Sequence, residues 1–65
     1  MTLEEMTQRA VSKGFNRKEA VERLFEGFQK HRGDNLAYYL HYWGFATEKQ
    51  AGLIAEEYEA LLNRN

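Results

Sequence analysis

The chain has 65 residues, with nine Lys or Arg, ten Asp or Glu and no cysteine. This length allows one domain, residues 1–65, with a small core and marginal stability. The lack of cysteine excludes disulfides and thiolate metal sites, and it favours a reducing, cytoplasmic setting. The net charge of −1 gives no electrostatic reason to expect nucleic acid or an anionic membrane as partner. No apolar run approaches the roughly 20 residues that span a bilayer, and the acidic start of the chain argues against a secretory signal.

The first predicted helix covers residues 3–13. Thr2 and Glu5 have the spacing of a capping box, in which each side chain binds the backbone N–H of the other residue. Gly14 is expected to end this helix in a left-handed conformation, with the ring of Phe15 folding back over the helix end.

The second predicted helix covers residues 17–32, with Asn16 as its cap. Its apolar positions form one stripe, and Gly33 is expected to end it. Three basic residues in its last turn suit the negative end of the helix dipole, namely Lys30, His31 and Arg32.

The third predicted helix covers residues 35–43. Asp34 is expected to cap it directly. Gly44 and Phe45 are expected to end it, which repeats the glycine–phenylalanine arrangement that ends the first helix.

The fourth predicted helix covers residues 48–62, and Thr47 and Gln50 form a second capping box before it. Apolar residues then follow a period of 3.6 to the end of the helix. Gly52 is the one weak position, since glycine inside an exposed helix costs up to about 1 kcal/mol relative to alanine.

These signals predict an all-α fold, a small four-helix domain with short loops and antiparallel or orthogonal packing. Alternation of period two is absent, so no strand is expected, and links of two to four residues favour helices that pack beside their neighbours. The predicted core consists of apolar residues from all four helices: Leu3, Met6, Ala10, Val21, Leu24, Phe25, Phe28, Leu36, Leu40, Trp43, Ile54, Tyr58 and Leu61.

The segment 38–45 holds five of the nine aromatic residues. A helix this short buries one face, and a small bundle offers few partners for the other rings. Exposed apolar patches often mark contact surfaces, where tyrosine and tryptophan are enriched. We therefore predict a protein-binding surface at Tyr38, Tyr42, Trp43 and Phe45. The alternative is a central helix surrounded by the other three, with the tyrosine hydroxyls reaching water.

The function favoured by these residues is a small, non-enzymatic interaction or regulatory module that binds another protein or itself as a homodimer. Residues 1–33 carry a net charge of +2 and residues 34–65 a net charge of −3, which suits head-to-tail or antiparallel association. No catalytic residues, cofactor or metal are expected. The only serine, Ser12, has no orienting base, and His31 and His41 do not have the spacing of metal ligands.

A DNA-binding regulator of the helix-turn-helix type is the alternative function, although nucleic acid is the less expected partner. The third and fourth predicted helices have suitable spacing, and Lys49 and Gln50 stand where a recognition helix would contact bases. The acidic residues Glu56, Glu57 and Glu59 then follow, and they would be repelled by phosphates.

The segment Val11-Ser12-Lys13-Gly14-Phe15-Asn16-Arg17, followed by Glu19-Ala20-Val21, resembles the first loop of a ubiquitin-associated domain. Residues 33–40 resemble the start of the third helix of that family. The resemblance implies a three-helix arrangement in which Gly14 and Phe15 correspond to the ubiquitin-contacting loop. It covers about half of the chain, with a second helix several residues longer than in that family and a fourth helix that the family does not explain.

Overall fold

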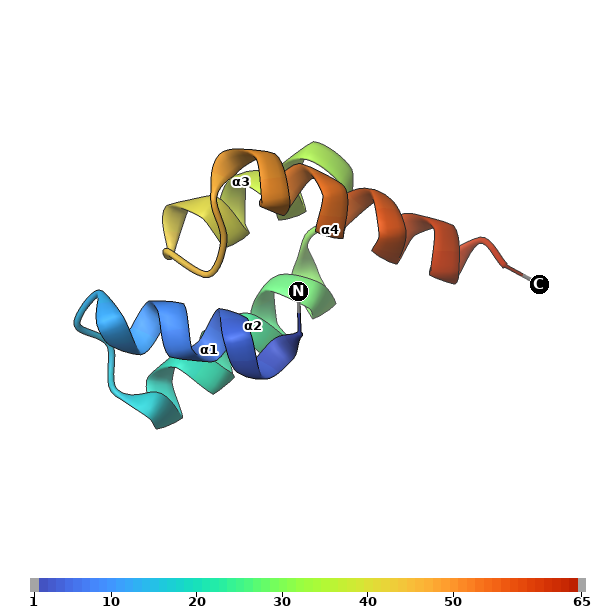
Figure 1. Cartoon of the computed structure of the whole chain (residues 1–65). Helices are drawn as coiled ribbons and strands as arrows, with labels where there is room; N and C mark the ends of the chain where they lie inside the picture. Colours follow the sequence, from blue (N-terminus) through green and yellow to red (C-terminus); the bar gives the residue numbers. More distant parts are fainter. Residues whose placement is uncertain (1, 65) are drawn as a thin grey trace.

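The computed structural model describes residues 2–64, and this range contains four helices and no strand. The helices are α1 (Leu3–Ser12), α2 (Arg17–Lys30), α3 (Gly33–Tyr42) and α4 (Glu48–Leu62). Helix α1 packs beside α2, and α3 packs beside α4, so the fold consists of two helical hairpins in contact through α2 and α3 (Figure 1). The C-terminal part of α4 extends beyond the other helices, and the molecule measures 36 × 21 × 18 Å. The predicted all-α four-helix class is confirmed.

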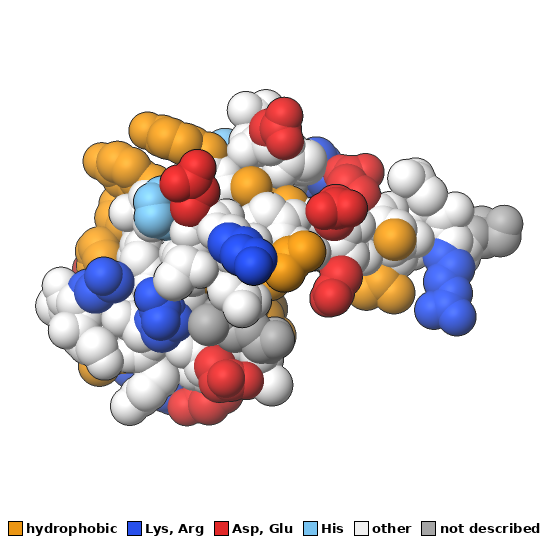
Figure 2. Space-filling view, turned by 45° about the horizontal axis from the view of Figure 1, so that its top comes forward, with side chains coloured by type: hydrophobic (Ala, Val, Ile, Leu, Met, Phe, Trp, Pro, Cys, Tyr) orange, Lys and Arg blue, Asp and Glu red, His pale blue; other side chains and the backbone are white. Residues whose placement is uncertain are grey.

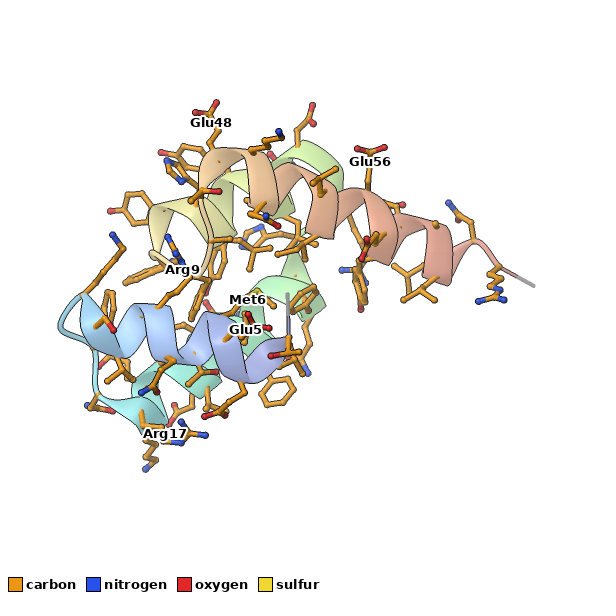
Figure 3. All side chains as sticks on the ribbon, in the orientation of Figure 1. Glu5, Met6, Arg9, Arg17, Glu48 and Glu56 are labelled. Carbon is orange, nitrogen blue, oxygen red and sulfur yellow. The ribbon has the colours of Figure 1, made fainter. Side chains whose placement is uncertain are left out.

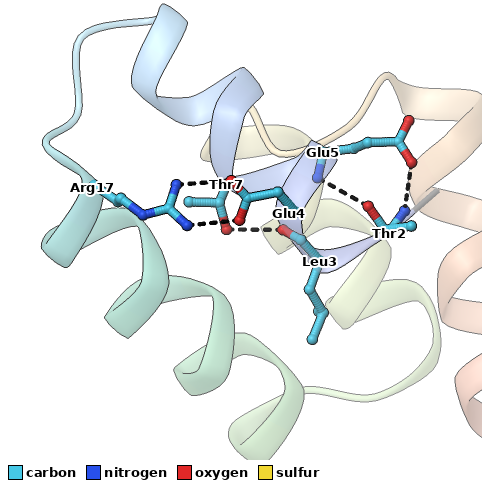
Figure 4. Close-up of polar contacts among 6 residues, drawn as sticks. All are labelled: Thr2, Leu3, Glu4, Glu5, Thr7 and Arg17. Carbon is cyan, nitrogen blue, oxygen red and sulfur yellow. Dashed lines mark hydrogen bonds and ion pairs between the residues drawn. The ribbon is translucent and has the colours of Figure 1, made fainter.

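Three of the helices begin at the side-chain caps that the sequence predicts. The Thr2 hydroxyl accepts a hydrogen bond from the Glu5 N–H at 3.1 Å, and the Glu5 carboxylate accepts one from the Thr2 N–H at 3.0 Å (Figure 4). The backbone N–H of Thr2, and next its hydroxyl, lower the pKa of Glu5 because both favour the charged carboxylate. The side chains of Asn16 and Thr47 accept from the third N–H of α2 and α4 at 2.7 and 3.2 Å. Local sequence therefore fixes where these helices start.

Helices α1 and α3 end in the same backbone arrangement. Gly14 and Gly44 have φ values of +114° and +79°, in the left-handed region that favours glycine. The N–H of Phe15 donates to the carbonyl of Ala10 at 3.2 Å, and the N–H of Phe45 donates to that of Leu40 at 2.9 Å. Both ends are Schellman motifs, which confirms the two predicted glycine–phenylalanine stops.

The boundary between α2 and α3 differs from the prediction. Helix α2 ends at Lys30, and α3 begins at Gly33. Gly33 therefore does not end α2, and Asp34 lies in the first turn of α3 instead of capping it. Arg32 explains the early end, because its guanidinium donates to the carbonyls of Phe28 and His31 and so satisfies the end of α2 from outside the helix.

The core is built largely of small side chains. Residues at most 3% exposed are Met6, Thr7, Ala10, Ala20, Leu24, Leu36, Leu40, Phe45, Ala46, Ala51 and Ala55. Five of these were predicted. The predicted residues Phe28, Trp43, Ile54 and Tyr58 are half-buried against this core, and Val21 is half-buried without packing on it. Phe28 of α2 meets Tyr58 of α4 edge to face, with ring centroids 4.9 Å apart, which ties the two hairpins together. Four of the buried residues are alanines on α1, α2 and α4, and small side chains of this kind allow helices to pack closely.

The prediction of a core position is wrong for three residues. Leu3, Phe25 and Leu61 are each at least half exposed. Leu61 is the last residue but one of α4, and the C-terminal part of α4 extends beyond the other helices, so Leu61 stays exposed. Leu3 and Phe25 lie on helices whose contacts are already filled by Met6, Ala10 and Leu24.

An ion pair joins the two helices of the first hairpin. The Arg17 guanidinium donates to both carboxylate oxygens of Glu4, at 3.0 and 2.6 Å (Figure 4). This hydrogen bond lowers the pKa of Glu4 and raises that of Arg17, since each charge favours the other. Both side chains are mostly exposed, so we expect the pair to set the hairpin geometry more than its stability.

Candidate functional site

Helix α3 presents two tyrosines to solvent. Leu36 and Leu40 are fully buried on one face of the helix, whereas Tyr38 and Tyr42 are 69% and 66% exposed. Because these tyrosines are one turn apart, their rings stack, with centroids 6.0 Å apart and planes at 29°. In Figure 2, hydrophobic side chains gather at the end of the molecule away from the C-terminal end of α4. The exposed pair gives α3 a flat aromatic face that no other helix covers.

Trp43 continues this face from Tyr42. The two rings meet edge to face with centroids 5.4 Å apart, and the other side of Trp43 meets Phe15 at 5.3 Å. The Arg23 guanidinium lies 5.0 Å from the Trp43 ring centroid. Trp43 is therefore held in place while part of its ring remains exposed. We call Tyr38, Tyr42 and Trp43 the aromatic surface.

Phe45 does not belong to the aromatic surface. It is 1% exposed, and it is the largest fully buried side chain among the described residues. The Schellman motif at Gly44 reverses the chain after Trp43, so the next side chain enters the core between α3 and α4. The prediction of Phe45 as a binding residue is therefore corrected by its burial.

Tyr39 points toward α2, and its ring lies beside that of Trp43, with centroids 6.2 Å apart. Its hydroxyl donates to the Arg23 carbonyl at 2.9 Å, and the Glu26 carboxylate lies 3.4 Å from the same oxygen. Burial, and next the negative charge of Glu26, raise the pKa of Tyr39. Its ring also packs on His31, with centroids 4.7 Å apart. Tyr39 thus helps to hold α3 of the second hairpin against α2 of the first.

A concavity that the sequence did not predict adjoins the aromatic surface. It has a volume of about 440 Å³, and it is lined by Arg9, Lys13, Phe15, His41, Tyr42, Trp43, Gly44, Ala46 and Thr47. Arg9 and Lys13 carry positive charge, His41 can carry it, and the lining contains no carboxylate. Figure 3 shows Arg9 extending from α1 toward the other hairpin. We call this the cationic concavity. The basic residues near the end of α1 are its only sequence signal, because the fold alone brings them to α3.

The outward face of α4 carries mixed charge. Glu48, Lys49 and Gln50 are exposed at its start, and Glu48 and Glu56 both point outward from the helix (Figure 3). Glu48, Lys49 and Glu56 line the same shallow hollow. A recognition helix for DNA needs a face that attracts phosphates, and the two carboxylates beside Lys49 work against this.

The other polar side chains singled out in the sequence have structural partners. The Ser12 hydroxyl donates to the Gln8 carbonyl at 2.9 Å, and Nδ1 of His41 lies 3.3 Å from the Ala46 carbonyl oxygen. Within residues 2–64, no three His, Cys, Asp or Glu side chains come together in a metal-binding arrangement. None of the helices in that range is both long and apolar enough for a membrane span.

Comparisons with protein-family models, curated proteins and solved structures give no match to this chain. The geometry of its own residues is therefore the basis for any functional proposal.

Proposed function

We propose that the protein is a non-enzymatic interaction module that binds another protein through its aromatic surface. The observation that carries this proposal is the exposed stack of Tyr38 and Tyr42 beside the immobilised ring of Trp43. Rigid aromatic side chains lose little conformational freedom on binding, and each can bury a large area against a partner. A partner segment with apolar side chains would cover this face.

The sole tryptophan of the chain provides the assay, because Trp43 lies within the proposed site. A displayed library of random dodecapeptides would be selected on the protein, and enriched peptides would then be titrated while Trp43 fluorescence is followed. We expect Tyr42→Ala to weaken binding at least tenfold, as for a binding hot spot. Its effect on stability should stay below about 1 kcal/mol, because the side chain is mostly exposed.

Phe25→Ala is the matched control, since Phe25 is an exposed aromatic residue on α2 outside the aromatic surface. It should leave peptide affinity unchanged. Equal losses of affinity in the two variants, or no enriched peptide at all, would contradict the proposed function.

Self-association is a second proposal, supported by the free end of α4. A shallow hollow there is lined by Glu57, Ala60, Leu61 and Arg64. A second copy whose α4 runs antiparallel about the midpoint of Ala60 and Leu61 would bring each Glu57 near Arg64, which follows the end of the other α4. Such a contact is self-complementary, as a twofold dimer requires, and its small size makes the dimer weak.

Sedimentation from low micromolar to near-millimolar concentration tests this dimer. Glu57→Arg should reduce association, and the double variant Glu57→Arg with Arg64→Glu should restore it, because the charge pairing is then reversed but intact. A strict monomer throughout this range would contradict the proposal.

A further inference from the structure

The cationic concavity places two unpaired charges beside the aromatic surface. Of the three ion pairs among residues 2–64, none includes Arg9 or Lys13. Nε of Arg9 is buried, and it has no hydrogen-bond partner in the described part of the chain. A buried N–H without a partner is costly, and native structures usually satisfy such groups. The Arg9 guanidinium therefore has no partner among the described residues, and its charge is free to pair with an acceptor from outside the chain.

The surroundings show which kind of acceptor fits. The concavity has no carboxylate in its lining, although the whole chain has more acidic than basic residues. The alkyl chain of Lys13 lies against Gly44, where a Cβ atom would stand 2.5 Å from Lys13 Cδ. This contact holds the Lys13 chain beside the Schellman turn of α3, next to Trp43.

Tyr42 and Trp43 belong both to the aromatic surface and to the wall of the concavity. One bound segment could thus contact the rings and the cations together. Carboxylates pair with guanidinium and ammonium groups through charge-assisted hydrogen bonds, and these strengthen in a partly water-excluded hollow.

We propose that the protein recognises a peptide segment of a partner protein in which an Asp or Glu side chain enters the cationic concavity while neighbouring apolar side chains cover Tyr42 and Trp43. This inference rests on the proposed function of the aromatic surface. It adds the charge of the ligand and the residues that select it.

The same random dodecapeptide library provides the test. Selection on the unaltered protein should enrich Asp and Glu beside apolar positions, and the enriched peptides should bind more weakly as salt concentration rises. The variant Arg9→Gln with Lys13→Met should lose this enrichment and bind the same peptides about tenfold more weakly. Methionine keeps an unbranched chain over Gly44 while removing the charge.

Lys18→Gln with Lys49→Gln is the control, because it removes the same net charge from exposed positions outside the concavity. It should retain the acidic enrichment. Circular dichroism melts of both double variants would establish that each is folded. Lys13→Glu provides an independent measurement, since reversing the charge should enrich Lys and Arg in the selected peptides.

The outcomes separate the two proposals. Peptides that depend on Tyr42 but show no acidic preference would overturn the ligand charge and leave the proposed function standing. Acidic enrichment that persists without the charges of Arg9 and Lys13 would also overturn the inference. The absence of any enriched peptide would overturn both. A concentration-dependent dimer abolished by the Arg9 and Lys13 variant would identify a second copy as the occupant, which again overturns it.

Discussion

Substitution of Gly27 by alanine should lower stability, although the same change normally stabilises a helix. Gly27 lies inside α2, where alanine is ordinarily favoured over glycine by about 1 kcal/mol. A Cβ atom at Gly27 would lie 2.6 Å from two ring carbons of Tyr39, whereas carbon atoms in contact are about 3.5–4.0 Å apart. The ring would have to retreat by about 1 Å.

The Tyr39 ring has little freedom to retreat. Its hydroxyl is bound to the Arg23 carbonyl, and His31 packs on the ring. Overpacking of this kind costs about 1–3 kcal/mol. After the gain in helix propensity, Gly27→Ala should therefore destabilise the protein by about 1 kcal/mol.

Gly52→Ala is the matched control, because Gly52 also lies inside a helix and its added Cβ would meet no atom within 4 Å. This variant should be more stable by up to about 1 kcal/mol. The two variants should thus differ by about 2 kcal/mol, or roughly 8–16 °C in melting temperature for a domain of this size. Urea denaturation followed by far-UV circular dichroism measures both values.

A double-mutant cycle with Tyr39→Ala identifies the cause. Without the ring, Gly27→Ala should become stabilising, as at Gly52. A stabilising Gly27→Ala in the otherwise unaltered chain would refute the described contact between α2 and α3. A loss of stability that is the same with and without the Tyr39 ring would show that the clash lies elsewhere.

Three further predictions concern pH, burial and DNA. The raised pKa of Tyr39 means that the neutral phenol stabilises the fold. This stabilisation is fully present below 10.0, the pKa in the unfolded chain, and it is lost as pH rises through the higher pKa of the folded protein. In urea denaturation on both sides of pH 10.0, Tyr39→Phe should lose less stability at high pH than the unaltered protein, and equal losses would contradict this. Phe45→Ala should cost about 3–5 kcal/mol in thermal melts, far more than Tyr42→Ala, and comparable effects would invalidate the division into core and surface. Titration with mixed duplex DNA at low salt should show no tight binding, because carboxylates flank Lys49 on α4; tight and salt-sensitive binding would favour the DNA-reading alternative.

The helix starts at Thr2, Asn16 and Thr47 and the stops at Gly14 and Gly44 could be predicted because each depends on residues within a single turn of backbone. A cap needs one side chain and one nearby N–H, so the sequence contains the whole interaction. The end of α2 could not be predicted in this way. Arg32 closes that helix with its guanidinium, and nothing in the local pattern distinguishes this use of an arginine from exposure to solvent.

Only part of the core was predicted, because periodicity identifies the apolar face of a helix but does not show how much of that face a neighbouring helix covers. Leu61 continues the period of α4, yet α4 extends past its neighbours there. Ala51 and Ala55 are fully or almost fully buried although alanine is common on helix surfaces, so their burial had no distinctive signal. Coverage depends on the arrangement of whole helices, which short-range patterns do not specify.

The candidate site also has one part that local sequence indicates and one part that depends on how whole helices are arranged. The exposure of Tyr38 and Tyr42 was one of two interpretations of the sequence, and the structure agrees with it because the buried face of α3 is narrow, with Leu36 and Leu40 one turn apart. The cationic concavity had no such signal, because Arg9 and Lys13 precede Trp43 by some thirty positions and reach it only when the hairpins pack.

The small residues of the core and the aromatic surface have a common physical origin. Small residues at several helix contacts, the alanines of α1, α2 and α4 and Gly27 of α2, leave little room for further rings beside Phe28, Phe45 and Tyr58. Tyr39 shows the limit, since its ring fits against α2 only because Gly27 has no side chain. Tyr38 and Tyr42, on another face of α3, stay exposed and stack on one another, and Tyr42 meets the half-buried ring of Trp43. Close packing of the helices therefore stabilises the fold and, at the same time, leaves Tyr38, Tyr42 and part of Trp43 exposed to solvent.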